Sequence, residues 1–161
     1  MTKTLDEKVE QWFIDRNLHE ANPVISFKRV MEDTSDLFKA VSRKDSLLIE
    51  NALGSMQVFL NGLELQIKNG ADIQATPEEM ELLLMVASLG HLADKLHKHI
   101  FYSETKTPQI KSDLIMLHSN IHSIAIHNST SADTCLNIAF DEIKSKKRKI
   151  IHSLIVTEVD L

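Results

Sequence analysis

The chain has 161 residues, of which 43% are hydrophobic and 25% are charged, so one ordinary globular domain is expected and a disordered chain is excluded. The net charge of −5 argues against a protein whose main activity is non-specific binding of nucleic acid. The single cysteine, Cys135, excludes an intrachain disulfide and a cysteine metal cluster, and no segment has the uncharged apolar length that spans a bilayer.

Six helices are predicted in chain order, over residues 4–18, 23–43, 45–69, 77–100, 108–127 and 131–147. The first begins in "MTKTLDEKVEQW", which is charged and lacks the apolar run of a signal peptide, so a cytoplasmic protein is expected. Each proline directly follows a residue typical of a helix N-cap, in the pairs Asn22-Pro23, Thr76-Pro77 and Thr107-Pro108. Thr76 and Glu79 form a capping-box pattern, and Gly70 suits a helix C-terminus.

These elements predict an all-α fold, a single bundle of about five to six helices that forms one domain over residues 1–161. Strand-like residues occur only in "IIHSLIVTEV", so the C-terminal tail is predicted to be short and either irregular or β. Gly54 and Gly90 each lie in the middle of a long apolar helix. A glycine inside a helix costs up to about 1 kcal/mol relative to alanine, so we expect these two to let central helices approach closely.

Three acids, Glu32, Asp33 and Asp36, lie within five residues of the predicted helix 23–43. Glu32 and Asp36 are one turn apart and repel each other by a few tenths of a kcal/mol. Asp33 is the acid nearest the apolar face. Two interpretations stand on these residues alone: a solvated face on which Arg29 pairs with Asp33, or part of a metal site.

The next predicted helix carries, beside its broad apolar face, a narrow stripe of Asn51, Ser55, Val58 and Gly62. The stripe is small and polar at its N-terminal end. Taken alone, it indicates close packing against a neighbouring helix.

The stretch "EKVEQWFIDRNLHEANPVISFKRVMEDTSDLFKAVSRKDSLLIENALGSMQVFL" resembles the start of the MazG-like nucleoside triphosphate pyrophosphohydrolases, in their short bacterial and phage forms. The family pattern has a Trp and an Asp-Arg in its first helix, then Glu-Glu-x-x-Glu-Leu, then an acidic block ending in Gly-Asp. The matching residues are Trp12, Asp15 and Arg16 in the first part and Glu32, Asp33, Asp36 and Leu37 in the second.

The resemblance implies an all-α, oligomeric enzyme that uses Mg²⁺ or Mn²⁺ to split a nucleoside triphosphate into the monophosphate and pyrophosphate. Glu32, Asp33 and Asp36 would then be metal ligands, and one of them the catalytic base. The third block departs from the family, because Ser55 follows Gly54 where an aspartate is expected and Asn51 or Ala52 falls where another acid is expected. The loss of two carboxylates should weaken binding of a divalent metal.

The end of the chain, "CLNIAFDEIKSKKRKIIHSLIVTEVDL", resembles the tail of the same family through Ile143, Lys144, Glu158 and Asp160. Within it, the basic run 144–149 has two interpretations. Cations stabilise a helix C-terminus, and the resemblance instead implies that Lys146 and Lys147 meet substrate phosphates. The resemblance likewise implies substrate contacts elsewhere, at Trp12, Arg16, Arg29, Asn51 and Ser55.

Two classes of function follow from these residues. The chain is either a pyrophosphohydrolase homologue with weakened or lost activity, or a non-catalytic nucleotide-binding or structural protein on the same scaffold. The expected partners are a nucleoside triphosphate or related nucleotide and further copies of the chain, as a dimer or tetramer, in a bacterial cell or, for a phage protein, the host cytoplasm. His118 and His122 have the i, i+4 spacing of a zinc or nickel site, and the alternative is that both lie on the surface.

Overall fold

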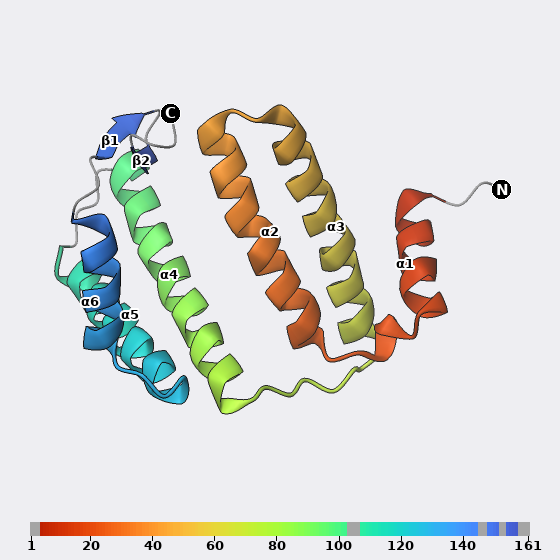
Figure 1. The fold of residues 1–161 in the computed structure, drawn as a ribbon. Coiled ribbons are helices and arrows are strands. Elements are labelled where there is room, and N and C mark those ends of the chain that lie inside the picture. Colours follow the sequence, from red (N-terminus) through yellow and green to blue (C-terminus); the bar gives the residue numbers. More distant parts are fainter. Residues whose placement is uncertain (1–3, 103–106, 145–147, 152–153, 158–161) are drawn as a thin grey trace. The chain divides into compact units, whose positions relative to one another are not determined.

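The structure is a computed structural model that describes residues 4–102, 107–144, 148–151 and 154–157; for 107–109 and the two strands it describes the backbone alone. The prediction of an all-α fold is confirmed (Figure 1). In chain order the elements are α1 (Leu5–Asp15), the 3₁₀ helix η1 (Leu18–Glu20), α2 (Pro23–Arg43), α3 (Ser46–Lys68), α4 (Pro77–Tyr102), α5 (Thr107–His127), α6 (Ala132–Ile143), β1 (Arg148–Ile151) and β2 (Leu154–Thr157).

Two of the three predicted cap-and-proline helix starts are confirmed by their hydrogen bonds. The Asn22 side chain accepts from the Val24 amide at 3.1 Å, next to Pro23 at the first position of α2. Thr76 and Glu79 accept from each other's amides at 3.2 and 3.0 Å, which is the predicted capping box. After α3, Gly70 has φ +70°, the left-handed conformation typical of a residue just past a helix end.

The first and last helices end three or more residues earlier than predicted. The first helix ends at Asp15, because Asn17 takes a left-handed conformation with φ 55° and the chain continues as η1. The helix predicted over 131–147 begins at Ala132, after Ser131, which caps it by accepting from the Thr134 amide at 3.1 Å. It ends at Ile143, and residues 145–147 of the predicted range lie outside the described residues.

In the described part of the C-terminal tail, residues 148–151 and 154–157 form strands, the β alternative of the two that were expected. Strands β1 and β2 pair antiparallel, with Arg148 opposite Thr157 and Ile151 opposite Leu154.

The chain divides into two compact units, one of residues 1–74 with 147–161 and one of residues 75–146. In the first unit, α2 and α3 form an antiparallel hairpin, since only Lys44 and Asp45 connect them. Lys44 turns the chain with φ 55°, and the Asp45 side chain caps α3 by accepting from the Leu48 amide at 3.1 Å. The prediction of one domain over residues 1–161 stays a prediction.

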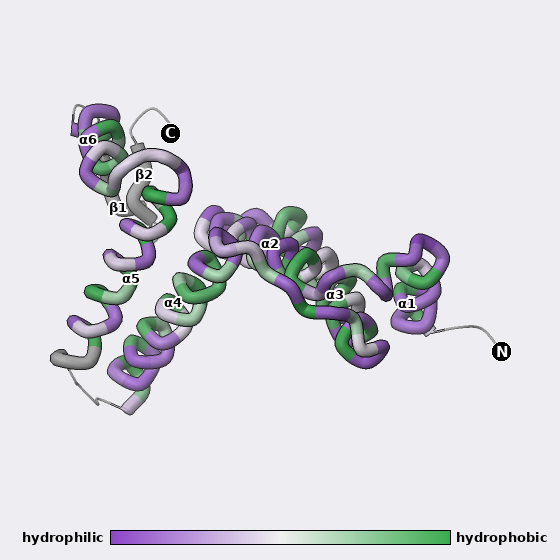
Figure 2. The backbone as a smooth tube through the Cα atoms, turned by 90° about the horizontal axis from the view of Figure 1, so that it is seen from below, coloured by the Kyte–Doolittle hydropathy of each residue, from purple (hydrophilic) through white to green (hydrophobic). Residues whose placement is uncertain are grey.

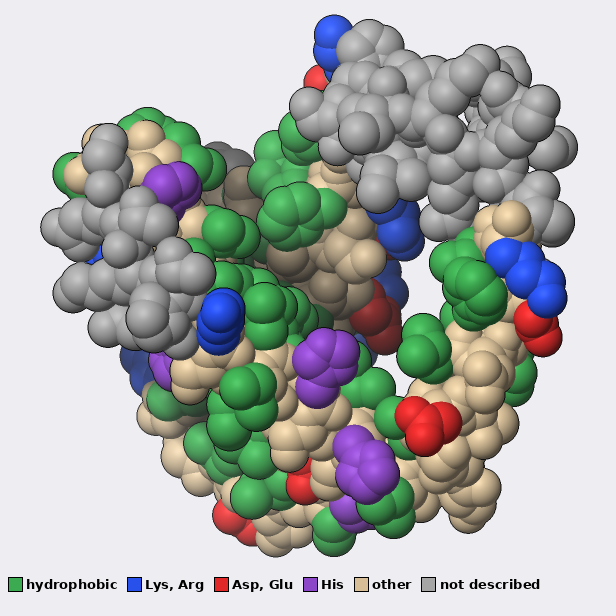
Figure 3. Space-filling view, turned by 90° about the vertical axis from the view of Figure 1, so that its left-hand side faces the viewer, with side chains coloured by type: hydrophobic (Ala, Val, Ile, Leu, Met, Phe, Trp, Pro, Cys, Tyr) green, Lys and Arg blue, Asp and Glu red, His purple; other side chains and the backbone are tan. Residues whose placement is uncertain are grey.

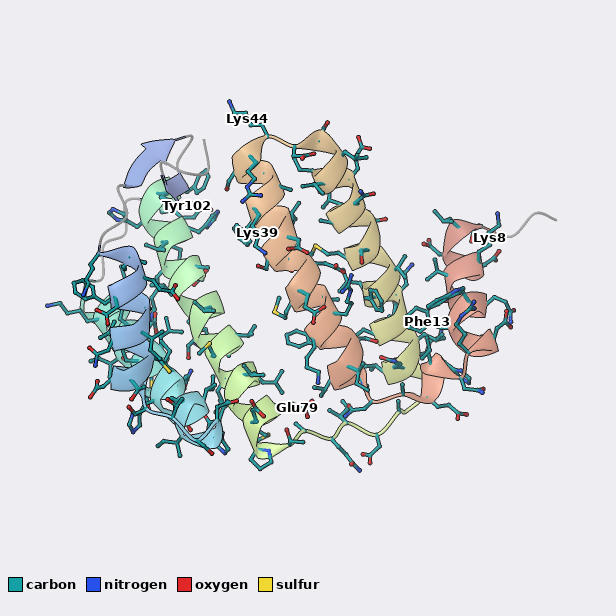
Figure 4. All side chains as sticks on the ribbon, viewed as in Figure 1. Lys8, Phe13, Lys39, Lys44, Glu79 and Tyr102 are labelled. Atoms are coloured by element: carbon teal, nitrogen blue, oxygen red, sulfur yellow. The ribbon has the colours of Figure 1, made fainter. Side chains whose placement is uncertain are left out.

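Helix α1 packs on α3 through Phe13, which is 1% exposed (Figure 4). Its ring occupies the space that a side chain at position 62 would take, so Gly62 is required for this contact. The expectation for Gly54 and Gly90 was wrong, because a Cβ atom at either position would meet nothing within 4 Å. The close approach therefore lies two turns further along α3 than the sequence suggested.

η1 is held to α3 by Gln66, whose side chain is almost fully buried. Its Nε2 atom donates to the Leu18 carbonyl at 2.8 Å. A buried amide bonded to an irregular backbone segment fixes that segment, since the polar group has no water to bond to instead.

In the second unit, α4 and α5 form a hairpin held by polar pairs along its length. Glu78 pairs with Asn128 at 3.1 Å, Ser88 with Asn120 at 3.3 Å, and Lys95 with Asp113. Asp113 and Asn120 are buried. Figure 2 shows hydrophobic and hydrophilic residues interleaved along α4. No helix among the described residues is long and apolar enough to cross a membrane.

Candidate functional site

A groove of about 430 Å³ lies along the α2–α3 hairpin and contains five of the ten site residues predicted from the sequence. Residues 29, 33, 36, 40 and 43 of α2 alternate steps of four and three, which puts them on one helical face. Small side chains on both helices leave the space open. The lining residues are Arg29, Asp33, Asp36, Lys39, Ala40 and Arg43 of α2 and Leu48, Asn51, Ala52 and Ser55 of α3.

Asp33 lines this groove and is only 4% exposed. The Ser55 hydroxyl donates to its Oδ2 atom at 2.6 Å across the hairpin, and Arg29 Nη2 lies 3.3 Å from its Oδ1 atom. Burial of a charged carboxylate is costly unless hydrogen bonds and an opposite charge compensate it. Each carboxylate oxygen of Asp33 therefore has a partner within the protein, Ser55 on α3 for one and Arg29 on α2 for the other.

The other two acids are exposed and paired within α2. Arg29 Nη1 donates to Glu32 at 2.9 Å, and Lys39 Nζ donates to Asp36 at 3.0 Å. Glu32 does not line the groove, whereas Asp36 does. The guanidinium of Arg29 thus bridges Glu32 and Asp33 and lies 5.7 Å from the Phe59 ring centre.

In this arrangement each of the three acids already has a partner within the protein. Mg²⁺ requires oxygen ligands in a near-ideal octahedron, usually with one or two carboxylates free to coordinate. Among the residues that the structure describes, no group of three or more His, Cys, Asp or Glu side chains is placed to hold a metal ion. The metal-ligand roles of Glu32, Asp33 and Asp36 stay predictions.

The groove carries more positive than negative charge. Its lining contains three cations, Arg29, Lys39 and Arg43, and two carboxylates, Asp33 and Asp36. This leaves one net positive charge, in a chain whose total charge is −5. Lys39 is labelled in Figure 4, one turn before Arg43 on α2. Arg43 makes no hydrogen bond or ion pair within the described part of the chain. Such a guanidinium, exposed and unpaired beside an open groove, is suited to an anionic ligand.

Trp12 and Arg16 do not belong to this groove. The Arg16 guanidinium lies 4.4 Å from the Trp12 ring centre, and its Nη1 atom donates to the Trp12 carbonyl at 3.3 Å. Trp12 is 40% exposed and lines a separate depression of about 280 Å³ with Lys8, Val9 and Val58. One face of the indole is therefore covered by Arg16, and the predicted contact of Trp12 and Arg16 with substrate stays a prediction.

Of the other residues predicted to contact substrate, two line the groove and two lie outside the described residues. Asn51 and Ser55 line the groove, and their contact with substrate stays a prediction. Lys146 and Lys147 lie outside the described residues.

His118 and His122 are both exposed on α5. Figure 3 shows histidine side chains at the surface among hydrophobic ones. No third ligand joins the pair within the described ranges, and metal binding by the two histidines stays a prediction.

The sequence reasoning missed Lys39, Ala40, Arg43 and Leu48 as lining residues. One signal was present, since Arg29, Asp36 and Arg43 are spaced by seven residues and so share a helical face. The small size of Ala40 and Ala52, which are 1% and 7% exposed, makes the groove but carries no chemical signal of its own.

Comparisons of the chain with protein-family models, with curated proteins and with solved structures gave no match.

Proposed function

We propose that this chain is a MazG-like nucleotide-binding protein whose α2–α3 groove holds a nucleoside triphosphate or related nucleotide, with metal-dependent hydrolysis weakened or lost. The proposal joins the resemblance of the sequence blocks to the contents of the groove. Of the residues that the resemblance marks, Arg29, Asp33, Asp36, Asn51 and Ser55 line this one groove.

The observation that carries the proposal is the hydrogen bond from the Ser55 hydroxyl to Asp33. In the family pattern an aspartate is expected at the position of Ser55, and two facing carboxylates repel each other unless a cation lies between them. The serine carries no charge, so that repulsion is absent, and its hydroxyl donates a hydrogen bond to Asp33. A site in which Arg29 balances the charge of the buried acid and Ser55 donates a hydrogen bond to it needs no metal for its own stability.

A panel of ribo- and deoxyribonucleoside triphosphates tests the proposal. Calorimetry reports binding, and pyrophosphate release with Mg²⁺ and with Mn²⁺ reports hydrolysis. We expect binding of at least one nucleotide that weakens in Arg29→Gln, with little or no release of pyrophosphate. The proposal fails when no nucleotide binds, and its non-catalytic part fails when metal-dependent turnover is robust.

One observation favours the second function, a structural role in a homo-oligomer. No residue of α4 is buried, although the helix exposes large apolar side chains at Met80, Leu82, Leu84, Leu89, Leu96 and Ile100. A helix that is apolar on several sides is normally covered by another protein surface, which a second copy of the chain would supply. Light scattering coupled to size-exclusion chromatography measures the assembly, and a dimer or tetramer is expected. A monomer at all concentrations would contradict this second function.

A further inference from the structure

We propose that the α2–α3 groove holds a di- or triphosphate chain by means of side-chain cations, without a divalent metal. The inference rests on the proposed function, because it names the part of a nucleotide that the groove binds and the groups that balance its charge. A metal-dependent site would bind the same ligand only together with Mg²⁺.

The first support is the sign of the charge in the groove. Three cations and two carboxylates line it, and the two carboxylates are already paired with two of those cations. The rest of the chain is acidic overall. A phosphate chain is therefore attracted to this groove more than to the average surface, and the lining has no excess of negative charge to attract a free divalent cation.

The second support is that two of the three cations, Lys39 and Arg43, both lie in the last turns of α2. Lys39 and Arg43 are four residues apart on α2, so their side chains extend over the same stretch of the lining. Asn51 lines the groove from α3 and offers an amide donor. A guanidinium can donate two parallel hydrogen bonds to phosphate oxygens, and Arg43 has no partner in the described ranges that would compete.

The third support is that both carboxylates of the groove already have partners within the protein. A metal at Asp33 would have to displace the Ser55 hydroxyl and compete with the Arg29 guanidinium. Magnesium on a phosphate chain also cancels two of its negative charges, which weakens its attraction to Lys39 and Arg43. Binding should therefore be as tight or tighter when magnesium is removed.

The test is calorimetric titration of the full chain with ATP and, separately, with inorganic tripolyphosphate, in EDTA and in excess Mg²⁺. Both ligands are expected to bind in EDTA, with equal or lower affinity in Mg²⁺. Arg43→Gln should weaken binding in EDTA about tenfold, the size expected for loss of a charged hydrogen bond. Lys68→Gln is the control: it also removes one positive charge, but at the C-terminal end of α3, where Lys68 lines a different depression. It should leave affinity within about twofold.

The outcomes separate this inference from the proposed function. If ATP binds only in Mg²⁺, metal-free binding of the phosphate chain is wrong and nucleotide binding stands. Metal-free binding by Lys39 and Arg43 is also wrong if Arg43→Gln and Lys68→Gln lose affinity equally, or if ATP binds and tripolyphosphate does not. If tripolyphosphate binds and ATP does not, metal-free binding of phosphate stands and the proposed nucleotide ligand is wrong. No binding of either ligand overturns both. Circular dichroism of each variant confirms that the helices are intact.

Discussion

The Ser55 hydroxyl donates a 2.6 Å hydrogen bond to the Asp33 carboxylate across the α2–α3 hairpin. The bond connects Asp33, which is only 4% exposed, to the facing helix, and both residues line the groove. It also distinguishes this groove from a site with two facing carboxylates. The predictions below concern this bond, the packing that positions α3, and the chemistry that the groove permits.

Replacement of Ser55 by alanine should destabilise the protein by about 1–3 kcal/mol, because the buried Asp33 carboxylate loses a donor. Urea unfolding measures the change. Ser42→Ala is the matched control, since the Ser42 hydroxyl bonds to the Phe38 carbonyl within its own helix, and its effect should stay within about 0.5 kcal/mol. Equal effects in the two variants would show that the Ser55–Asp33 bond adds no stability.

We expect Ser55→Asp to create a dependence on divalent metal that the natural chain does not show. The new carboxylate faces Asp33, so without metal the variant should lose about 1–3 kcal/mol by repulsion and lost hydrogen bonding. A divalent cation that binds between the two carboxylates stabilises the folded state by mass action. Thermal unfolding with EDTA and with Mg²⁺ reads this directly.

The expected result for Ser55→Asp is a melting temperature that rises with Mg²⁺ in the variant and stays unchanged in the natural chain. A Mg²⁺-dependent rise of equal size in both would contradict the role given to Ser55, because the natural groove would then bind the metal with a serine in place.

Gly62→Ala should destabilise the protein by more than 1 kcal/mol, because the added methyl group overlaps the buried ring of Phe13. Gly54→Ala is the matched control on the same helix. A Cβ atom there meets nothing within 4 Å, and alanine is the better helix former, so stability should rise by up to about 1 kcal/mol. Urea unfolding of the two variants should therefore shift in opposite directions. A Gly62→Ala variant as stable as the natural chain would show that α1 does not depend on this contact.

The helices were predictable from the sequence because their ends are chemically marked. Asn22 before Pro23 and the pair Thr76 and Glu79 gave helix starts that the structure confirms through hydrogen bonds. The end of α1 was missed, because only the backbone angle of Asn17 breaks the helix there, and an asparagine takes a left-handed conformation only in some contexts.

The groove was only partly predictable. Asp33 was placed nearest the apolar face by helical periodicity, and the structure buries it. Ser55 was singled out by resemblance, whereas its bond to Asp33 depends on how two helices meet, which no spacing along one helix reports. Lys39 and Arg43 were missed because the lining of a groove depends on small neighbours such as Ala40, and these look like ordinary core residues in a sequence.

The central proposal is that the Arg29 ion pair and the Ser55 hydrogen bond satisfy Asp33 in place of a metal, and that metal-dependent hydrolysis is therefore weakened or lost. The most direct test is pyrophosphate release from a nucleoside triphosphate panel with Mg²⁺ and with Mn²⁺, for the natural chain and for Glu32→Ala in parallel. The account predicts the same low release from both proteins with either metal. Robust metal-dependent release by the natural chain that Glu32→Ala abolishes would contradict it.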